Sequence, residues 1–212
     1  MIIKFDGVDG CGKSTLSRAV AKYLSSRRHT VAVMREFSSP AKYSAGSSKP
    51  LPVASMRIRE TVLDPTFDCD DVERQLLLHF LSRRKNRVEI PYLHKLNDFV
   101  VVDRSTLSNY AYAAAIDPEL AHLSEVATDD VEKADLIFWI DTPVDVCMTR
   151  VLDRSLDAVE QKGRIYFERV RELFQGRANA RATVHVLDGS MDIQRLVEQV
   201  VSIIDRRRDV GS

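Results

Sequence analysis

Short apolar runs alternate along this chain with longer stretches in which apolar residues recur at helical spacing. Five runs have the length and composition of buried strands, at residues 2–5, 30–34, 99–102, 136–140 and 184–187. Strands that are apolar throughout are typical of parallel sheets covered on both sides, with helices as the crossovers. The pattern therefore predicts an α/β fold, a five-stranded parallel sheet with helices on both faces.

Apolar residues spaced by three or four predict the helices. The clearest helical stretches cover residues 13–26, 54–63, 70 or 71 to 94, and 192–207, with a bend at Pro91 in the third. Residues 37–52 contain five serines and little periodicity, so a loop is predicted there. A loop of this length inside a compact domain is usually functional.

A glycine-rich motif follows the first predicted strand. Residues 7–14 read GVDGCGKS, the pattern G-x-x-x-x-G-K-S, and a predicted helix begins at its end. In such a loop backbone N–H groups surround phosphates, the lysine meets the β- and γ-phosphates, and the serine reaches Mg²⁺. The alternative, a glycine-rich turn with an incidental lysine, does not explain the flanking strand and helix. The predicted nucleotide-binding residues are Gly7, Asp9, Gly10, Cys11, Gly12, Lys13, Ser14 and Thr15.

Composition favours one domain that acts on small molecules. The 31 acidic and 31 basic residues balance, which gives no support for nucleic-acid binding. A length of 212 residues suits a single α/β domain, here residues 1–212. Because the first residues already form a predicted strand and no apolar run approaches the ~20 residues of a membrane span, we expect a cytoplasmic protein without membrane contact. Cys11, Cys69 and Cys147 have unrelated spacings and are predicted to be free thiols.

Charged residues follow the predicted strands at the edge of the sheet where ligands bind. Asp103 and Arg104 come directly after the third run. Asp103 is predicted to lie near Mg²⁺ together with Ser14, as a carboxylate does in other phosphate-loop enzymes. Arg104 suits an acceptor that is itself a phosphate monoester, because that acceptor carries nearly two negative charges. A structural ion pair between Asp103 and Arg104 is the alternative.

Two further sets of residues are spaced for one helix face. Asn109 and Tyr112 follow Ser105 at intervals of four and three, so they share a side of the predicted helix. Phe80 and Arg84, one turn apart, suit a planar base, since the ring stacks and the guanidinium donates to the base edge. The alternatives are a core position for Tyr112 or Phe80 and a solvated position for Arg84.

Together these residues resemble the thymidylate kinase family of nucleoside monophosphate kinases over nearly the whole chain. The matching segments are 5–15, 35–36, 103–104, 108–109, 111–112, 140–143, 156–157 with Glu160, and 167–171. The resemblance implies phosphoryl transfer from ATP, with Mg²⁺, to a nucleoside monophosphate, most closely dTMP. It also implies a homodimer through the long helices.

The resemblance assigns acceptor-binding roles residue by residue. Phe80 stacks on the base, Arg84 bonds its edge, and Asp9 and Arg104 lie at the acceptor phosphate. Tyr112 helps to exclude a ribose 2′-hydroxyl. The full predicted acceptor set is Asp9, Glu36, Phe37, Phe80, Arg84, Arg104, Asn109 and Tyr112. Residues 37–40 read FSSP where the family usually has Pro-Gly-Gly-Thr, so the acceptor wall departs from the family pattern.

A mobile lid is implied at residues 149–157. Because the loop carries Cys11 and lacks an arginine, the resemblance implies that the lid supplies the charge that stabilises the transferring phosphoryl group. Arg154 is the first candidate for this catalytic role and Arg150 the second, the other packing on adenine. A solvated basic turn is the alternative for both. The predicted catalytic set is therefore Asp9, Lys13, Arg104, Arg150 and Arg154, without a general base.

Two other functions fit parts of the sequence. A deoxynucleoside kinase also has a phosphate loop and an acid-Arg-Ser turn, and would use Glu36 as base toward a 5′-hydroxyl. A modified pyrimidine monophosphate is a further possible acceptor. A regulatory protein that binds ATP without transfer is the alternative from a different class, although such a protein would more readily have lost Lys13, Asp103 or Arg104.

Overall fold

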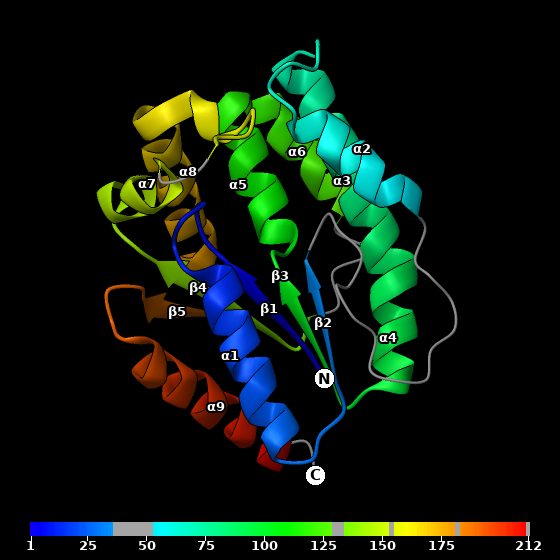
Figure 1. Ribbon diagram of the computed structural model, residues 1–212, viewed down its shortest axis with the longest axis vertical. Coiled ribbons are helices and arrows are strands. Elements are labelled where there is room, and N and C mark those ends of the chain that lie inside the picture. The colour runs from blue at the N-terminus through cyan, green and yellow to red at the C-terminus, as the bar shows by residue number, and fades with distance from the viewer. Residues whose placement is uncertain (36–52, 129–133, 153–154, 181–182, 211–212) are drawn as a thin grey trace.

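The predicted strands form one parallel sheet in the computed structural model, which describes residues 1–35, 53–128, 134–152, 155–180 and 183–210 (Figure 1). In space the strands follow the order β2 (Val31–Arg35), β3 (Phe99–Asp103), β1 (Ile2–Asp6), β4 (Leu136–Asp141) and β5 (Val184–Asp188). The predicted fold class is confirmed. Each strand ends one residue later than predicted, because a polar residue at the carboxyl edge, such as Asp103 opposite Phe5, still pairs in the ladder.

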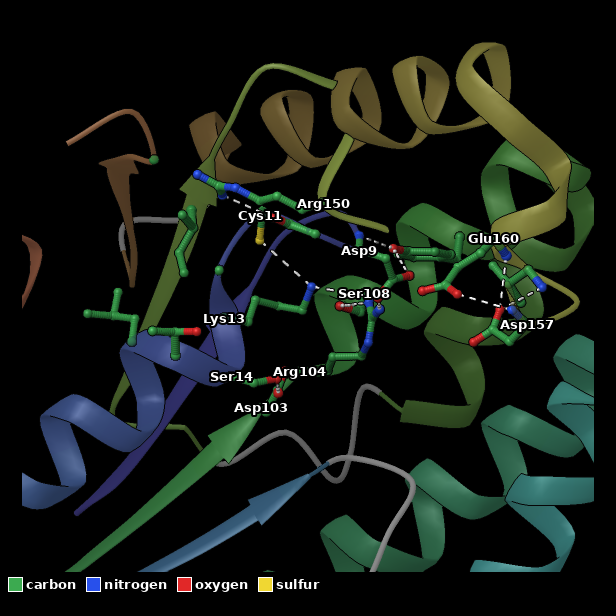
Figure 2. A pocket seen from close by; sticks show the side chains of 18 of the residues that line it. Asp9, Cys11, Lys13, Ser14, Asp103, Arg104, Ser108, Arg150, Asp157 and Glu160 are labelled. Carbon is green, nitrogen blue, oxygen red and sulfur yellow. Dashed lines mark hydrogen bonds and ion pairs between the residues drawn. The ribbon is translucent and has the colours of Figure 1, made fainter. Parts of the chain in front are cut away.

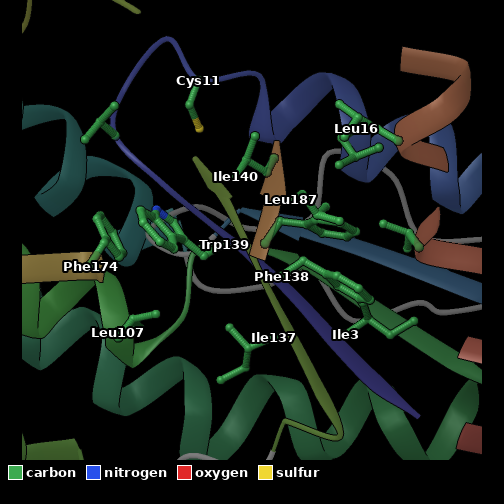
Figure 3. Packing of buried hydrophobic residues seen from close by; sticks show 14 of the residues in the cluster. Ile3, Cys11, Leu16, Leu107, Ile137, Phe138, Trp139, Ile140, Phe174 and Leu187 are labelled. Carbon is green, nitrogen blue, oxygen red and sulfur yellow. The ribbon is translucent and has the colours of Figure 1, made fainter. Parts of the chain in front are cut away.

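Both faces of the three central strands, β1, β3 and β4, are buried. Ile3 and Phe5 point into the larger core, where the Phe5 ring stacks on Phe138 with 5.4 Å between centroids (Figure 3). Ile2, the neighbour in sequence, packs on the opposite face with Ile90. Because successive strand residues face opposite sides, burial on both faces favours apolar residues at most positions.

Helices form the layers on either side of the sheet (Figure 1). Helix α1 (Lys13–Ser26) packs beside α9 (Ile193–Val210), and α5 (Thr106–Ile116) packs against α6 (Pro118–Thr128) and α8 (Gly163–Ala180). Further helices are α2 (Val53–Leu63), α3 (Asp71–Arg84), α4 (Ile90–Leu96) and α7 (Val144–Leu152). None of those in the described ranges is long and apolar enough to cross a bilayer. The loop predicted at 37–52 lies wholly within residues 36–52, which are outside the described residues.

The long helix predicted before β3 is present, but a π-helical turn divides it into α3 and α4. Asp70 caps α3 by accepting from the Glu73 N–H at 2.8 Å, while the Glu73 carboxylate accepts from the Asp70 N–H. At the other end Lys85–Glu89 forms a π-helical turn in which the Ile90 N–H donates to Lys85 O, five residues back. This π turn directly precedes Pro91, where the bend was predicted, and proline has no N–H and crowds the turn before it.

Candidate active site

A pocket of about 740 Å³ opens at the carboxyl edge of the sheet, beyond β1, β3 and β4 (Figure 2). The phosphate loop forms one wall, α5 another, and the segment after β5 a third. Predicted site residues that line it are Asp9, Gly10, Cys11, Gly12, Lys13, Ser14, Thr15, Asp103, Arg104, Asn109, Tyr112 and Arg150. The structure therefore brings together residues from four separate segments at the edge where α/β sheets bind ligands.

Lys13 lies buried at the centre of the phosphate loop. Its Nζ donates to Gly7 O and Val8 O, both at 2.8 Å, and lies 3.9 Å from Asp9 Oδ1. Gly10 allows the close packing of this loop because its φ is +83°, and a Cβ built there would lie 2.3 Å from the Cys147 carbonyl oxygen of α7. The backbone of α7 therefore packs directly against the loop, and the two loop carbonyls fix the position of the lysine ammonium.

Ser14 and Asp103 place two side-chain oxygens next to each other. The Ser14 hydroxyl, on the first turn of α1, donates directly to Asp103 Oδ2 at the end of β3 (Figure 2). Mg²⁺ is usually held by one or two protein oxygens and by substrate phosphates, so this pair fits the ion. Among the described residues no group of three or more His, Cys, Asp or Glu side chains is placed to hold a metal.

Asp9 and Arg104 form a charge pair over the pocket. Arg104 Nη2 contacts Asp9 Oδ1, the Tyr112 hydroxyl donates to Asp9 Oδ2 at 2.8 Å, and the guanidinium carbon lies 4.8 Å from the Tyr112 ring centroid. Burial disfavours the charge on Asp9, but Arg104, Lys13 and the tyrosine hydrogen bond outweigh it and lower its pKa to about 2. Arg104 also has a φ of +82°, a backbone conformation that is costly for a residue with a Cβ. Several contacts hold this arginine in place.

Asp6 is a site residue that the sequence reasoning missed. This fully buried carboxylate accepts from the Ser105 N–H at 3.1 Å and from the hydroxyls of Ser105 and Ser108. Ser108 Oγ in turn accepts from Arg104 Nη1 at 3.4 Å. A charged residue at the end of an otherwise apolar strand, just before the loop, was the available signal. Asp6 supports the turn that presents Arg104.

Of the two predicted lid arginines, Arg150 is among the described residues. Arg150, on α7, donates from Nη1 to Gly10 O at 3.1 Å and so lies against the phosphate loop (Figure 2). Arg154 lies outside the described residues. Cys11 is buried, its pKa is raised by burial, and its sulfur is 3.7 Å from Lys13 Nζ. All three cysteines are free thiols, as predicted.

Some of the residues predicted to bind the acceptor line the pocket and others do not. Asn109 is buried, lines the pocket and donates from Nδ2 to Ser82 Oγ at 2.6 Å. In the described part of the chain, the pocket lining does not include Phe80 or Arg84: Phe80 is 61% exposed, and Arg84 pairs with Glu89. From α2 and α3, the residues that line the pocket are instead Arg59, Leu63, Gln75 and Leu78. Glu36 and Phe37 lie outside the described residues.

Two further pocket walls were missed. Asp157 and Glu160 cap each other, the Asp157 carboxylate accepting from the Glu160 N–H at 2.9 Å and the Glu160 carboxylate from the Asp157 N–H at 3.1 Å. Ala158 N donates to Leu63 O at 3.0 Å, which ties this end of the predicted lid to α2. The second wall, after β5, is lined by Gly189, Met191, Ile193 and Leu196. The capping-box spacing of an acid and a glutamate was visible in the sequence, whereas the mostly apolar wall carries no motif.

A buried lysine in a glycine-rich loop, next to a serine–carboxylate pair at the edge of a parallel sheet, defines a phosphate-loop nucleotide-binding protein. A family model described as thymidylate kinase matches residues 5–200. The chain belongs to the thymidylate kinase family.

Its similarity to individual relatives extends over nearly the full length. It is 33% identical to a thymidylate kinase of Thermosipho africanus over 97% of this chain and 98% of that protein. It is 30% identical to a thymidylate kinase of Thermosipho melanesiensis over 99% of this chain and all of that protein. It is 27% identical to a thymidylate kinase of Fervidobacterium nodosum over 97% of this chain and 98% of that protein.

Proposed function

We propose that this protein transfers the γ-phosphoryl group of ATP to dTMP, giving dTDP. The observation that carries the proposal is the placement of the Asp9–Arg104 pair beside Lys13 in one pocket, so that a second anionic group can be bound next to a triphosphate. Family membership and relatives named thymidylate kinase support the choice of dTMP.

The chemistry requires positioning and charge more than a base. A phosphate oxygen of the acceptor is already a nucleophile, so Arg104 has to hold it in line against charge repulsion. Lys13 stabilises the β- and γ-phosphate oxygens as charge shifts during transfer. Mg²⁺, held by Ser14 and Asp103, would neutralise charge on the β- and γ-phosphates when bound. Asp9 keeps Arg104 oriented because it stays ionised.

Residues 149–157 are proposed as the lid of a single kinase domain, with Arg154 as its catalytic arginine. Arg154→Ala should lower kcat at least about tenfold, the effect of losing one charge-assisted contact of ~1.5 kcal/mol. The KM for dTMP should change little, because the contact strengthens only as transfer proceeds. Steady-state kinetics of Arg150→Ala, Arg154→Ala and the double variant measure both. A double variant with the parent kcat would remove the lid from the mechanism.

On the acceptor side, Asn109 and Tyr112 are proposed to border the base and sugar. Phe80 and Arg84 keep their proposed roles at the base, with Glu36 and Phe37 in the neighbouring wall. For Phe80 this requires the exposed ring to turn toward the pocket, since it does not line the pocket in the structure.

An ADP-release assay over a panel of nucleosides and nucleoside monophosphates tests the proposed function. dTMP should give the highest kcat/KM, and thymidine should be a poor acceptor. Faster use of thymidine than of dTMP would favour the deoxynucleoside kinase, with Glu36 as base. ATP binding without release of ADP on any acceptor would favour the regulatory protein.

A homodimer through the long helices is also proposed, in a cytoplasmic protein whose partners are small nucleotides. Exposed apolar side chains on α3 and the π turn, including Leu76 at 46% and Val88 at 56%, support a partner surface there. A second copy is the occupant that the family resemblance favours. Sedimentation analysis of the parent and of Leu76→Glu distinguishes dimer from monomer.

A further inference from the structure

A chain of buried polar side chains runs from the first strand to the pocket. Lys4 of β1 is 1% exposed and donates from Nζ to Asn86 Oδ1 at 2.6 Å. Asn86, in the π turn, donates from Nδ2 to Ser82 O at 2.9 Å and to Ser82 Oγ at 3.3 Å. Ser82 Oγ accepts from Asn109 Nδ2 at 2.6 Å, and Asn109 lines the pocket. This series of hydrogen bonds therefore ends at a residue that lines the pocket.

The direction of these hydrogen bonds follows from the chemistry of the groups. An ammonium group has donors and no acceptor, so the Asn86 oxygen must face Lys4. Its amide nitrogen then faces Ser82, where it finds a carbonyl and a hydroxyl oxygen as acceptors. Ser82 Oγ accepts from both amides, since Asn109 Nδ2 also donates to it. A buried network is stable in the arrangement that satisfies each member.

The consequence for Asn109 is a fixed amide orientation. With one N–H of Nδ2 donated to Ser82, the amide offers a ligand its Oδ1 acceptor and its second N–H, in fixed positions. A ring with an N–H on its pairing edge, the imide of thymine or uracil, complements an acceptor. Cytosine has an unprotonated ring nitrogen at the same place, so it would put two acceptors face to face.

We propose that Ser82, held by Asn86 and Lys4, is a positioning residue that sets Asn109 to select imide bases over cytosine. This inference rests on the proposed function and deepens it. Discrimination arises because a site built around one hydrogen bond leaves a buried polar group unpaired when the wrong partner binds. Ser82 acts through Asn109 and does not itself line the pocket in the described residues.

The test compares kcat/KM for dTMP, dUMP and dCMP in the parent and in Ser82→Ala. Loss of the hydroxyl frees the Asn109 amide to rotate, so the dTMP-to-dCMP ratio should fall about tenfold, mainly through a higher KM for dTMP, the size expected for one neutral hydrogen bond. Use of dUMP should fall in parallel with dTMP. Ser124→Ala is the matched control, since Ser124 is also a fully buried serine, on α6 rather than beside Asn109. Its ratio should equal that of the parent.

The outcomes separate the inference from the function. Suppose that the parent uses dTMP. If Ser82→Ala then keeps the parent's dTMP-to-dCMP ratio, or loses activity equally on all three acceptors, the positioning role of Ser82 is wrong while the proposed function stands. A parent that phosphorylates none of the monophosphates would overturn the proposed function. If Ser82→Ala does not fold, Ser82→Cys keeps the volume while replacing the oxygen by a weak acceptor, and the same ratio decides the question.

Discussion

Replacement of Lys13 by alanine should lower kcat by about 10²- to 10³-fold, the usual loss for one preorganised transition-state donor. The structure gives the reason: the ammonium is buried in the phosphate loop and held by two loop carbonyls, so its charge is positioned before a nucleotide arrives. Coupled ADP-release kinetics with dTMP measure the loss.

The control for this variant is Lys22→Ala, an exposed lysine on the same helix, which should retain the parent rate. Thermal melts of both variants report on the fold. A folded Lys13→Ala protein that turns over like the parent would contradict the assignment of the phosphate loop to catalysis.

Arg104→Ala should lower kcat/KM for dTMP by about 10²-fold or more, the range expected when one partner of a buried charge pair is removed. Two effects combine, because the acceptor phosphate loses its cation and Asp9 loses the guanidinium that it contacts. The basal ATPase activity, which uses water in place of the acceptor, should fall much less. Both the dTMP kinase activity and the ATPase activity are measured on the same preparation of Arg104→Ala and compared with those of the parent.

Stability can be separated from activity in this case. The double variant Asp9→Asn, Arg104→Ala removes the uncompensated carboxylate and should melt at a higher temperature than Arg104→Ala while staying inactive with dTMP. Arg169→Ala, at an exposed arginine paired with Glu172 on α8, is the matched control. Equal loss of ATPase and transfer in Arg104→Ala would speak against an acceptor clamp.

The fold was predictable because the sheet is buried on both faces. All five strands were located from apolar runs, and only their last, polar residues were missed. The π turn at Lys85–Glu89 was not predictable in the same way. Periodicity alone does not distinguish a π turn from an α-helical turn, because both continue the same helix.

The site was predictable where a motif fixes geometry. Lys13, Ser14, Asp103 and Arg104 meet as expected because the loop and the strand ends share one edge. Ser82 and Asn86 escaped notice, since serine and asparagine within a helical pattern look like solvated positions. Their importance depends on a buried lysine 82 residues away from Asn86, which no local pattern indicates.

The Asp9–Arg104 pair also bears on how the enzyme responds to acidity. With the Asp9 pKa at about 2 and that of Arg104 raised further above its already high value, neither partner changes charge across the physiological range. A phosphate monoester does change charge there, with a second pKa of about 6. Of the charged groups at the proposed acceptor site, the phosphate is then the one that changes charge near neutrality, so we expect kcat/KM for dTMP to rise with pH through about 6.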